Sequence, residues 1–345
     1  MFLDLWKYRS PIVGVTGSNG KSTVVTLLDE VLKGVERPSY LSGNIGNSPL
    51  NIFGTKLEKE NPVIILELSS YMLELFDDKH YVDIAVITNL TNNHLDRYGG
   101  SMEDYAEAKS KLANMAHTVT IVDVDDKGTR DYVLPLLKDH KIFPVSLEQE
   151  AMALGQNALG LGDNSLSIVK DGENLYDFKN ITIRNIHGTH NLYNIAFVLV
   201  ALVYLDVDFS KADPFVRAFK GLEHRIEFVR QIDGVNFIND SKSTSPDATI
   251  KALECVANGK NVILLIGGSD KGLSFSLLID SVIAYVKSAI ILPTESLEKI
   301  ESIFKETLTP VEYASSLEQA VLLAQKKSEN GDVVLLSPSA GSHVE

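Results

Sequence analysis

The sequence predicts an α/β protein: a P-loop-type central domain with a mostly parallel sheet, followed by a smaller Rossmann-like α/β domain. Short apolar, β-branched runs alternate with helical patterns along most of the 345 residues, as in parallel sheets covered by helices. A glycine-rich turn joins the first such run to the first such helix. A polar joint at 221–225 separates two series of these units. We therefore expect two domains, residues 1–221 and 222–345.

The first expected elements flank the glycine-rich turn. Residues 12–16 are a β-branched run and predict a strand, and residues 22–33 carry an apolar stripe and predict a helix. Residues 63–70 and 84–90 are continuous apolar runs, as expected for strands that are covered on both faces.

The rest of the first domain is predicted to contain alternating helices and strands and one antiparallel segment. Residues 103–116 have a helical pattern, and residues 118–123 read as a strand. Gly, Asn and Asp residues separate short strands within 155–187, which indicates an antiparallel excursion. Residues 189–205 are strongly apolar and predict a buried helix.

The sequence predicts that the second domain opens with a hairpin over 226–240, with Asp233-Gly234 at its turn. A helix follows from Pro246, then a strand over 261–268. Helices and strands continue to alternate, with strands at 288–293 and 332–339. This order predicts a small open sheet of the dinucleotide-binding type.

The net charge, the cysteine count and the length of the apolar runs exclude several classes of protein. The net charge of −14 argues against a nucleic-acid or membrane-surface partner, since both are polyanions. The single cysteine, Cys255, cannot form an intrachain disulfide, which fits a reducing compartment. No apolar run approaches the about 20 residues that a spanning helix needs. We expect a cytoplasmic protein.

The glycine-rich turn has the parts of a phosphate-binding loop. Gly17 and Gly20 let backbone N–H groups approach an anion, Lys21 can bind β- and γ-phosphates, and Ser22 can bind Mg²⁺. Val15 stands where the generic pattern has its first glycine. The loop predicts a nucleotide site.

The sequences of this loop and of several later segments resemble those of one protein family. "TGSNGKST" is similar to the loop of the Mur ligase family, in which that first glycine is not required. Further blocks in the same order also resemble this family: "GNIGNSPL", "LELSSYMLE", "ITNLTNNHLDRYG", "YAEAKSKL", "HNLYNIAFVLVAL", "GLEHRIEFV", "INDSKSTSPDATIKAL", "LLIGGSDKG" and "VVLLSPSAGS". The resemblance spans nearly the whole chain and is greatest to the D-glutamate-adding branch.

The resemblance implies ATP-driven amide formation through an acyl phosphate, in peptidoglycan precursor synthesis. The implied substrates are UDP-N-acetylmuramoyl-L-alanine and D-glutamate, and the implied cofactors are ATP and two Mg²⁺ ions. A monomer without membrane or nucleic-acid partners is expected. The chemistry consists mainly of positioning and charge neutralisation.

The resemblance also assigns site residues. The implied ATP-binding residues are Gly17, Asn19, Gly20, Lys21, Ser22, Thr23, Asn194, Arg225 and Asp240. The implied Mg²⁺ ligands are Ser22, Glu67, His94 and Lys109, the last after N6-carboxylation. His94, Lys109 and Lys242 are the implied catalytic residues, and Asn44, Thr244, Lys271 and Ser342 the implied substrate-binding residues. The local sequence alone predicts that Lys109 is a solvent-exposed lysine on a charged helix and that Asn194 belongs to a helix N-cap.

Two departures from the family pattern leave alternatives open. A uridine-binding domain of about a hundred residues normally precedes the loop, and an aromatic residue and a helix normally follow Ser342. Both are expected to be absent here, which would lower activity on the usual substrate. The alternatives are a short Mur-like ligase acting on a lipid-linked or polyglutamate substrate, and an inactive ATP-binding fragment or scaffold.

Overall fold

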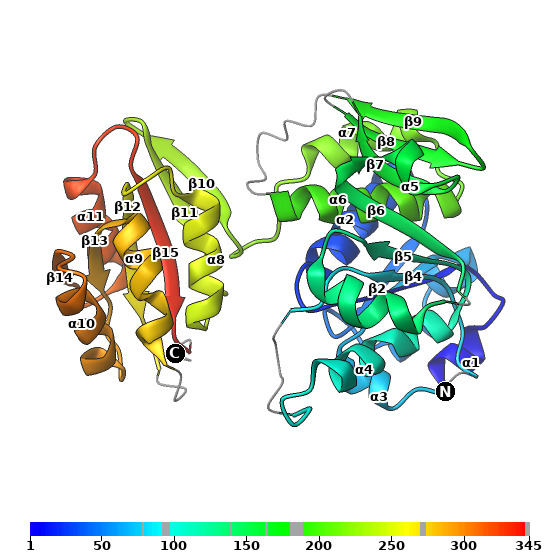
Figure 1. The fold of residues 1–345 in the computed structure, drawn as a ribbon, viewed down its shortest axis with the longest axis horizontal. Coiled ribbons are helices and arrows are strands. Elements are labelled where there is room, and N and C mark those ends of the chain that lie inside the picture. The colour runs from blue at the N-terminus through cyan, green and yellow to red at the C-terminus, as the bar shows by residue number, and fades with distance from the viewer. Residues whose placement is uncertain are drawn as a thin grey trace. The chain divides into compact units, whose positions relative to one another are not determined.

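A computed structural model shows how the sequence folds (Figure 1). It describes residues 1–77, 79–91, 97–138, 140–162, 165–179, 189–269 and 274–341. The chain forms two compact units, one from the described residues up to Phe219 and the other from those from Lys220 onward. The sequence had placed this boundary at Gly221. Each unit has its own sheet and its own apolar core.

The first unit is built on a nine-stranded sheet in the order β2-β3-β1-β4-β5-β6-β7-β8-β9. Its pairs are parallel from β2 to β7 and antiparallel from β7 to β9, so the predicted antiparallel excursion is confirmed. The strands are β1 (Ile12–Thr16), β2 (Ser39–Gly43), β3 (Val63–Glu67), β4 (Val82–Ile87), β5 (Ala116–Asp123), β6 (Ile142–Glu150), β7 (Ala158–Gly162), β8 (Ser165–Lys170) and β9 (Glu173–Lys179).

Helices cover both faces of this sheet (Figure 1). Helices α2 and α6 pack against each other and against the strands, while α4 packs against α3 and against β1, β4 and β5. A Cβ atom on Gly14 of β1 would come within 2.7 Å of Leu112 in α4, so glycine permits this close packing. The helices are α1 (Phe2–Trp6), α2 (Lys21–Gly34), α3 (Ser70–Glu74), α4 (Met102–Asn114), α5 (Ala151–Leu154), α6 (Thr189–Tyr204) and α7 (Phe209–Ala218).

Some predicted boundaries were wrong. The strand expected over 63–70 ends at Glu67, because Ser69 caps α3 by accepting a hydrogen bond from Met72 N at 3.3 Å. Elements α1, β2, β6 and α7 were not predicted at all. Helix α6 is buried as predicted, since it is apolar on all sides.

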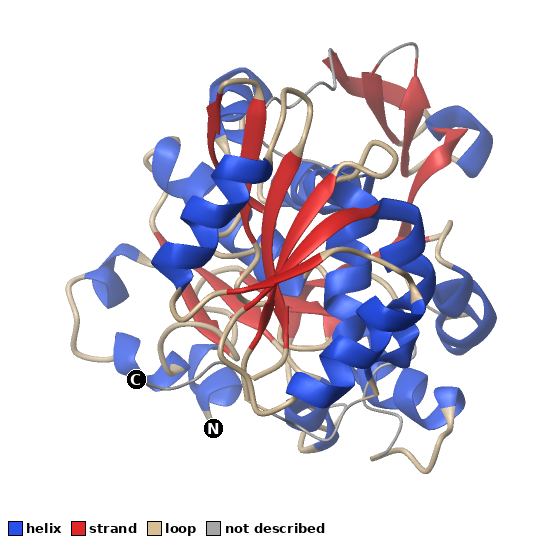
Figure 2. Cartoon of the chain, turned by 90° about the vertical axis from the view of Figure 1, so that its left-hand side faces the viewer, coloured by secondary structure: helices blue, strands red, loops and turns tan. Residues whose placement is uncertain are grey.

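The second unit has a six-stranded sheet in the order β10-β11-β15-β12-β13-β14, and only the β10–β11 pair is antiparallel. Figure 2 shows its strands running between helices on both faces. The strands are β10 (Glu227–Ile232), β11 (Val235–Asn239), β12 (Val262–Gly267), β13 (Val286–Ile291), β14 (Val311–Tyr313) and β15 (Val333–Ser339). The helices are α8 (Pro246–Val256), α9 (Ile279–Tyr285), α10 (Leu297–Glu306) and α11 (Leu317–Lys327).

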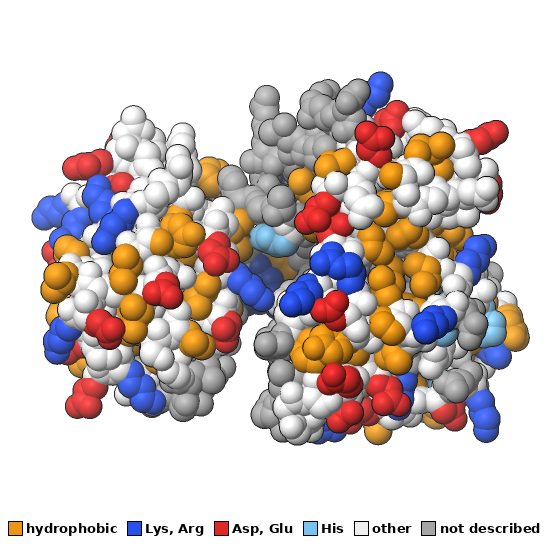
Figure 3. Space-filling view, in the orientation of Figure 1, with side chains coloured by type: hydrophobic (Ala, Val, Ile, Leu, Met, Phe, Trp, Pro, Cys, Tyr) orange, Lys and Arg blue, Asp and Glu red, His pale blue; other side chains and the backbone are white. Residues whose placement is uncertain are grey.

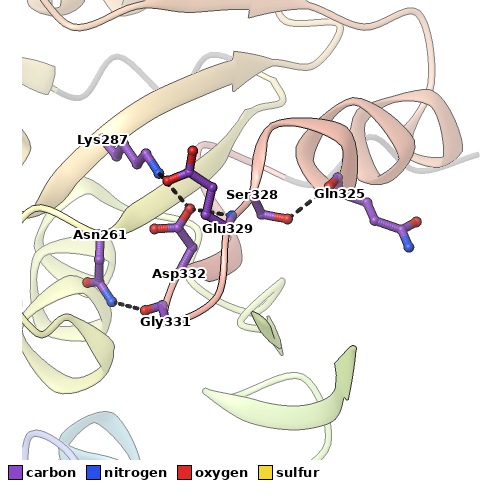
Figure 4. Close-up of polar contacts among 7 residues, drawn as sticks. All are labelled: Asn261, Lys287, Gln325, Ser328, Glu329, Gly331 and Asp332. Atoms are coloured by element: carbon purple, nitrogen blue, oxygen red, sulfur yellow. Dashed lines mark hydrogen bonds and ion pairs between the residues drawn. The ribbon is translucent and has the colours of Figure 1, made fainter. Parts of the chain in front are cut away.

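Local chemistry fixes the turns of this second unit. Asp233 and Gly234 both have positive φ, 51° and 78°, so the predicted hairpin turn is confirmed. The turn before β15 lies beside this hairpin turn, since Gly331 N donates to Gly234 O at 3.1 Å. At that second turn, Lys287 Nζ donates to Asp332 at 2.8 Å and to Glu329 at 3.2 Å (Figure 4). These contacts tie the turn between α11 and β15 to β13.

The visible surface carries charges of both signs. On the face drawn in Figure 3, lysine and arginine side chains are interspersed with aspartate and glutamate side chains in each unit. Within the described ranges, no helix combines the length and the apolar character needed to cross a membrane.

Candidate active site

The glycine-rich turn lies at the carboxyl edge of the first sheet, between β1 and α2. Gly17 has φ 142° and Gly20, the residue before α2, has φ 84°. A Cβ atom on Gly17 would overlap Thr88 Oγ1, and one on Gly20 would overlap Asn194 Oδ1. Both positions therefore need glycine for their backbone angle and for the close approach of neighbouring chain.

Two lysines converge on one carbonyl of this turn. Lys21 Nζ and Lys109 Nζ each donate a hydrogen bond to Gly17 O at 2.8 Å, and Lys21 Nζ also donates to Ser18 O at 3.0 Å. Ser22 and Thr23 occupy the first turn of α2 and are half-buried. The predicted phosphate-binding residues are thus gathered at a helix N-terminus, where backbone N–H groups and the helix dipole favour anions.

Lys109 is not the solvated helix lysine that its charged neighbours suggest. Its side chain is only 1% exposed and lies 4.6 Å from the Tyr105 ring centroid. Burial, and then the positive charge of Lys21, lower the pKa of Lys109 to about 6. The amine is therefore neutral at pH 7, the form in which a lysine nitrogen can act as a nucleophile.

Glu67 ends strand β3, directly beside the glycine-rich turn, since Glu67 pairs with Val15 of β1. The residue is 2% exposed, and its Oε1 accepts a hydrogen bond from Asn44 Nδ2 at 2.9 Å. Its Oε2 is buried and has no hydrogen-bond partner among the described residues. A buried carboxylate oxygen without a partner is costly, and a cation would satisfy it. The residue therefore fits a role as an Mg²⁺ ligand.

Asn44 is held against this carboxylate by its backbone as well. Its N–H donates to Glu67 O at 2.8 Å. Gly43, with φ 106°, leaves no room for a Cβ atom beside the same carbonyl. The structure thus brings together Asn44 and Glu67, which the sequence assigned separately to substrate and metal.

Asn194 lies on the other side of the turn. It is 4% exposed on α6, and its Nδ2 donates to Asn191 Oδ1 at 3.1 Å. Its neighbour Tyr193 donates to Asp125 Oδ2 at 2.6 Å, which anchors this end of α6 to the segment after β5. Asn194 is placed to contact a nucleotide bound at the turn, and that contact stays a prediction.

Sequence reasoning missed the segment that follows β4. Thr88 is 1% exposed and Asn89 is hydrogen-bonded to the main chain of Asn19. The signal that could have found them is polar residues directly after an apolar strand that neighbours β1.

In the second unit, Asp240 is buried rather than open. It is 2% exposed, and its carboxylate accepts hydrogen bonds from Ile226 N at 3.1 Å and Ser337 Oγ at 2.9 Å. Burial raises the pKa of the Asp240 carboxyl, against the effect of these bonds. Its predicted contact with the ribose of ATP stays a prediction.

The other predicted residues of this unit surround Asp240 in sequence. Arg225 and Lys242 are exposed, and Thr244 is half-buried. Lys242 N donates to His224 O at 3.1 Å, so the segment around Lys242 is held against the joint before β10. His94, Lys271 and Ser342 lie outside the described residues, and their predicted roles stay predictions.

Two family models match the sequence. Residues 15–202 match the Mur ligase middle domain, and residues 224–340 match the Mur ligase glutamate ligase domain. The chain belongs to the Mur ligase family. Mur ligases are ATP-dependent ligases that use Mg²⁺, and the glycine-rich turn and the buried carboxylate suit these two cofactors.

Relatives of the Mur ligase resemble it over nearly its whole length. UDP-N-acetylmuramoylalanine–D-glutamate ligase from Francisella philomiragia subsp. philomiragia is 36% identical over 337 residues, 98% of this chain and 72% of that protein. The protein of the same name from Francisella tularensis subsp. novicida is also 36% identical over 337 residues, with the same coverage.

Solved structures confirm the Mur ligase fold. A UDP-N-acetylmuramoyl-L-alanyl-D-glutamate–2,6-diaminopimelate ligase has a TM-score of 0.65 at 22% identity, covering 95% of this chain and 72% of that one. UDP-N-acetylmuramate-alanine ligase MurC from Thermotoga maritima has a TM-score of 0.65 at 19% identity, covering 99% and 75%. The fold class predicted from the sequence is therefore correct.

Proposed function

We propose that this Mur ligase joins D-glutamate to UDP-N-acetylmuramoyl-L-alanine, with ATP converted to ADP and phosphate. The observation that carries the proposal is the 36% identity to D-glutamate ligases over 98% of the chain. The lysines, glycines and buried carboxylate at the edge of the first sheet support it, because they suit the phosphoryl-transfer half of such a reaction.

In the proposed reaction, the substrate carboxylate oxygen attacks the γ-phosphorus and ADP leaves. The amine of D-glutamate then attacks the acyl carbon and loses a proton to solvent, and phosphate leaves with that carboxylate oxygen. Lys21 exchanges its two carbonyl acceptors for phosphate oxygens, which form stronger, charge-assisted hydrogen bonds. The N–H groups at the start of α2 hold the phosphates in position. The chain thus contributes mainly charge and orientation.

Ser22, Glu67, His94 and Lys109 are the proposed ligands of two Mg²⁺ ions, and Thr23 is proposed to bind ATP beside Ser22. When bound, Mg²⁺ neutralises negative charge on the phosphates. Glu67 is preset for this role because Asn44 fixes one carboxylate oxygen and leaves the buried Oε2 for the metal. In the second unit, Arg225 and Asp240 are proposed to contact ATP and Lys242 the acyl phosphate. Asn44 is proposed to contact substrate, and Thr244, Lys271 and Ser342 to bind D-glutamate.

Lys109 is proposed to carry an N6-carboxylate group. Its neutral nitrogen attacks the carbon of CO₂, a C–N bond forms, and the proton released goes to solvent. This converts a buried amine into an anionic oxygen donor of the kind Mg²⁺ prefers. Mass spectrometry of the intact chain in bicarbonate buffer tests it: wild type should gain the mass of one CO₂, and Lys109→Arg should not.

The single cysteine and the acidic composition support a cytoplasmic enzyme without a nucleic-acid or membrane partner. The proposed assembly is a monomer, which sedimentation velocity would check.

Phosphate release from ATP tests the proposed function. With UDP-N-acetylmuramoyl-L-alanine present, release should require D-glutamate, and L-glutamate serves as the control acceptor. Release that is indifferent to D-glutamate, or none at all with bound MgATP, would contradict the proposal and favour a different acceptor or an ATP-binding scaffold.

A further inference from the structure

The segment after β4 is bonded to the main chain of the phosphate loop. Ser18 N donates to Asn89 O at 2.9 Å, and Asn19 N donates to Asn89 Oδ1 at 2.9 Å. In return, Asn89 Nδ2 donates to Asn19 O at 3.2 Å, and Thr88 Oγ1 donates to the same oxygen at 2.6 Å. The N–H and the C=O of Asn19 are therefore both engaged by residues outside the loop.

The side chains of the loop face the same segment. Thr91 N donates to Ser18 Oγ at 2.9 Å, and Asn19 Nδ2 donates to Thr91 Oγ1 at 3.2 Å. Asn19 was expected from the sequence to bind ATP, yet its N–H, its C=O and its side-chain amide all bond to residues 88–91. The phosphate-binding part of the loop is accordingly expected to begin at Gly20, where the N–H groups of the first helical turn lie.

A loop containing two glycines has many accessible backbone conformations, and ordering it upon binding lowers affinity. The Asn89 amide imposes one orientation on the Asn19 peptide by pairing with its donor and its acceptor at once. The loop is thereby ordered at the folding stage, before nucleotide arrives.

We propose that Asn89 is a positioning residue that presets the phosphate loop for the triphosphate of ATP, with Thr88 assisting through the shared Asn19 oxygen. This inference rests on the proposed function, since it presumes that the loop binds ATP. It differs from a general structural role because it acts on phosphate binding and not on the nucleoside.

Calorimetry on the full chain tests the proposal with three probes: MgATP, tripolyphosphate with Mg²⁺, and adenosine. Asn89→Ala removes both side-chain hydrogen bonds to Asn19, each worth about a factor of five, so it should raise the Kd for MgATP and for tripolyphosphate tenfold or more. The Kd for adenosine should stay within twofold, about the scatter of a surface substitution.

Matched variants separate this role from a folding defect. Thr88→Val keeps the side-chain shape but removes the hydroxyl, so it should weaken MgATP binding, and Thr88→Ser should restore it. Asn174→Ala is the control, because Asn174 is an exposed asparagine whose Nδ2 bonds Asp177 at 3.1 Å and 3.2 Å on β9. It should leave all three affinities unchanged.

The outcomes distinguish the two proposals. Wild type that binds MgATP, together with an Asn89→Ala variant that binds it equally well, overturns the positioning role and leaves the proposed function intact. Equal loss of adenosine and triphosphate affinity in Asn89→Ala also overturns it, because that result indicates general damage. Wild type that fails to bind MgATP overturns both.

Discussion

Replacing Lys109 by methionine is predicted to stabilise the first unit while removing ligase activity. Lys109 is 1% exposed, and its pKa is lowered to about 6, mainly by burial. In the unfolded chain the ammonium is hydrated and has its ordinary pKa of 10.5. Folding at pH 7 must therefore remove a proton that the unfolded chain keeps. Methionine has a similar length and no proton to lose.

The size of this effect follows from the pKa difference. Between pH 6 and 10.5 the unfolded chain binds one more proton than the folded chain, so the free energy of unfolding of wild type rises with pH by about 1.4 kcal/mol per unit. Because pH 7 lies about 3.5 units below 10.5, the cost there is about 5 kcal/mol. The hydrogen bond from Lys109 Nζ to Gly17 O offsets about 1 kcal/mol of this cost. Lys109→Met should gain about 4 kcal/mol at pH 7.

Urea unfolding followed by tryptophan fluorescence measures this gain. Trp6 is the sole tryptophan and is fully buried on α1, so its emission reports the first unit. The measurement uses metal-free protein in CO₂-free buffer at pH 6.5, 7.5 and 8.5, with Lys211→Met, an exposed lysine on α7, as the control. The advantage of Lys109→Met should shrink by about 1.4 kcal/mol per pH unit. A less stable variant, or an advantage independent of pH, would refute the reasoning.

Three further substitutions test other parts of the site and its surroundings. Gly17→Ala places a methyl group against Thr88 at φ 142°, so calorimetry should show MgATP affinity reduced tenfold or more; unchanged affinity would contradict the loop geometry. Glu67→Gln should abolish the Mg²⁺-dependent rise in melting temperature without lowering the metal-free value, since the unpartnered oxygen loses its charge. The Arg97 pair lowers the pKa of Glu74 to about 2. The ion pair's contribution to the free energy of unfolding is fully present above pH 4.5 and is lost as pH falls through 2. Urea unfolding should therefore show Glu74→Gln to be less stable than wild type at pH 6 and equally stable near pH 2.

The sequence predicted those strands that are apolar throughout, because burial on both faces leaves a continuous signal. Strands β1, β3 and β4 come near to this: they are almost entirely buried, and each carries only one polar residue, Thr16, Glu67 and Asp83 respectively. Strand β2 has only five residues, with Ser39 and Ser42 buried and the other three half-buried, so its burial follows no regular alternation. Strand β6 contains Pro144, and neither strand gave a clear pattern. Helix α1 has five residues and depends on Trp6 packing against Phe2 and Phe53, a tertiary effect that periodicity cannot show.

The site was predictable where its residues are neighbours in sequence. Gly17, Gly20 and Lys21 lie in one turn, and their positions follow from phosphate-binding chemistry. The bonds from Asn89 to the loop depend on β4 lying beside β1, which only the folded sheet reveals. The burial of Lys109 could also have been predicted, from the spacing of apolar residues on its helix.

The signal for the burial of Lys109 is helical spacing. Tyr105, Lys109 and Leu112 stand at i, i+4 and i+7 on α4, and all three are at most 1% exposed. This spacing puts them on one face, so Lys109 belongs to the apolar stripe and not to the charged side of the helix. A lysine on a buried stripe is unusual enough to indicate function.

Transfer of oxygen from substrate to phosphate tests the central claim most directly. The claim is that the site joins a carboxylate to the γ-phosphate of ATP before D-glutamate reacts. With UDP-N-acetylmuramoyl-L-alanine labelled with ¹⁸O in its carboxylate, phosphate released during D-glutamate-dependent turnover should carry one ¹⁸O atom per molecule. Turnover that yields unlabelled phosphate would contradict the acyl-phosphate account.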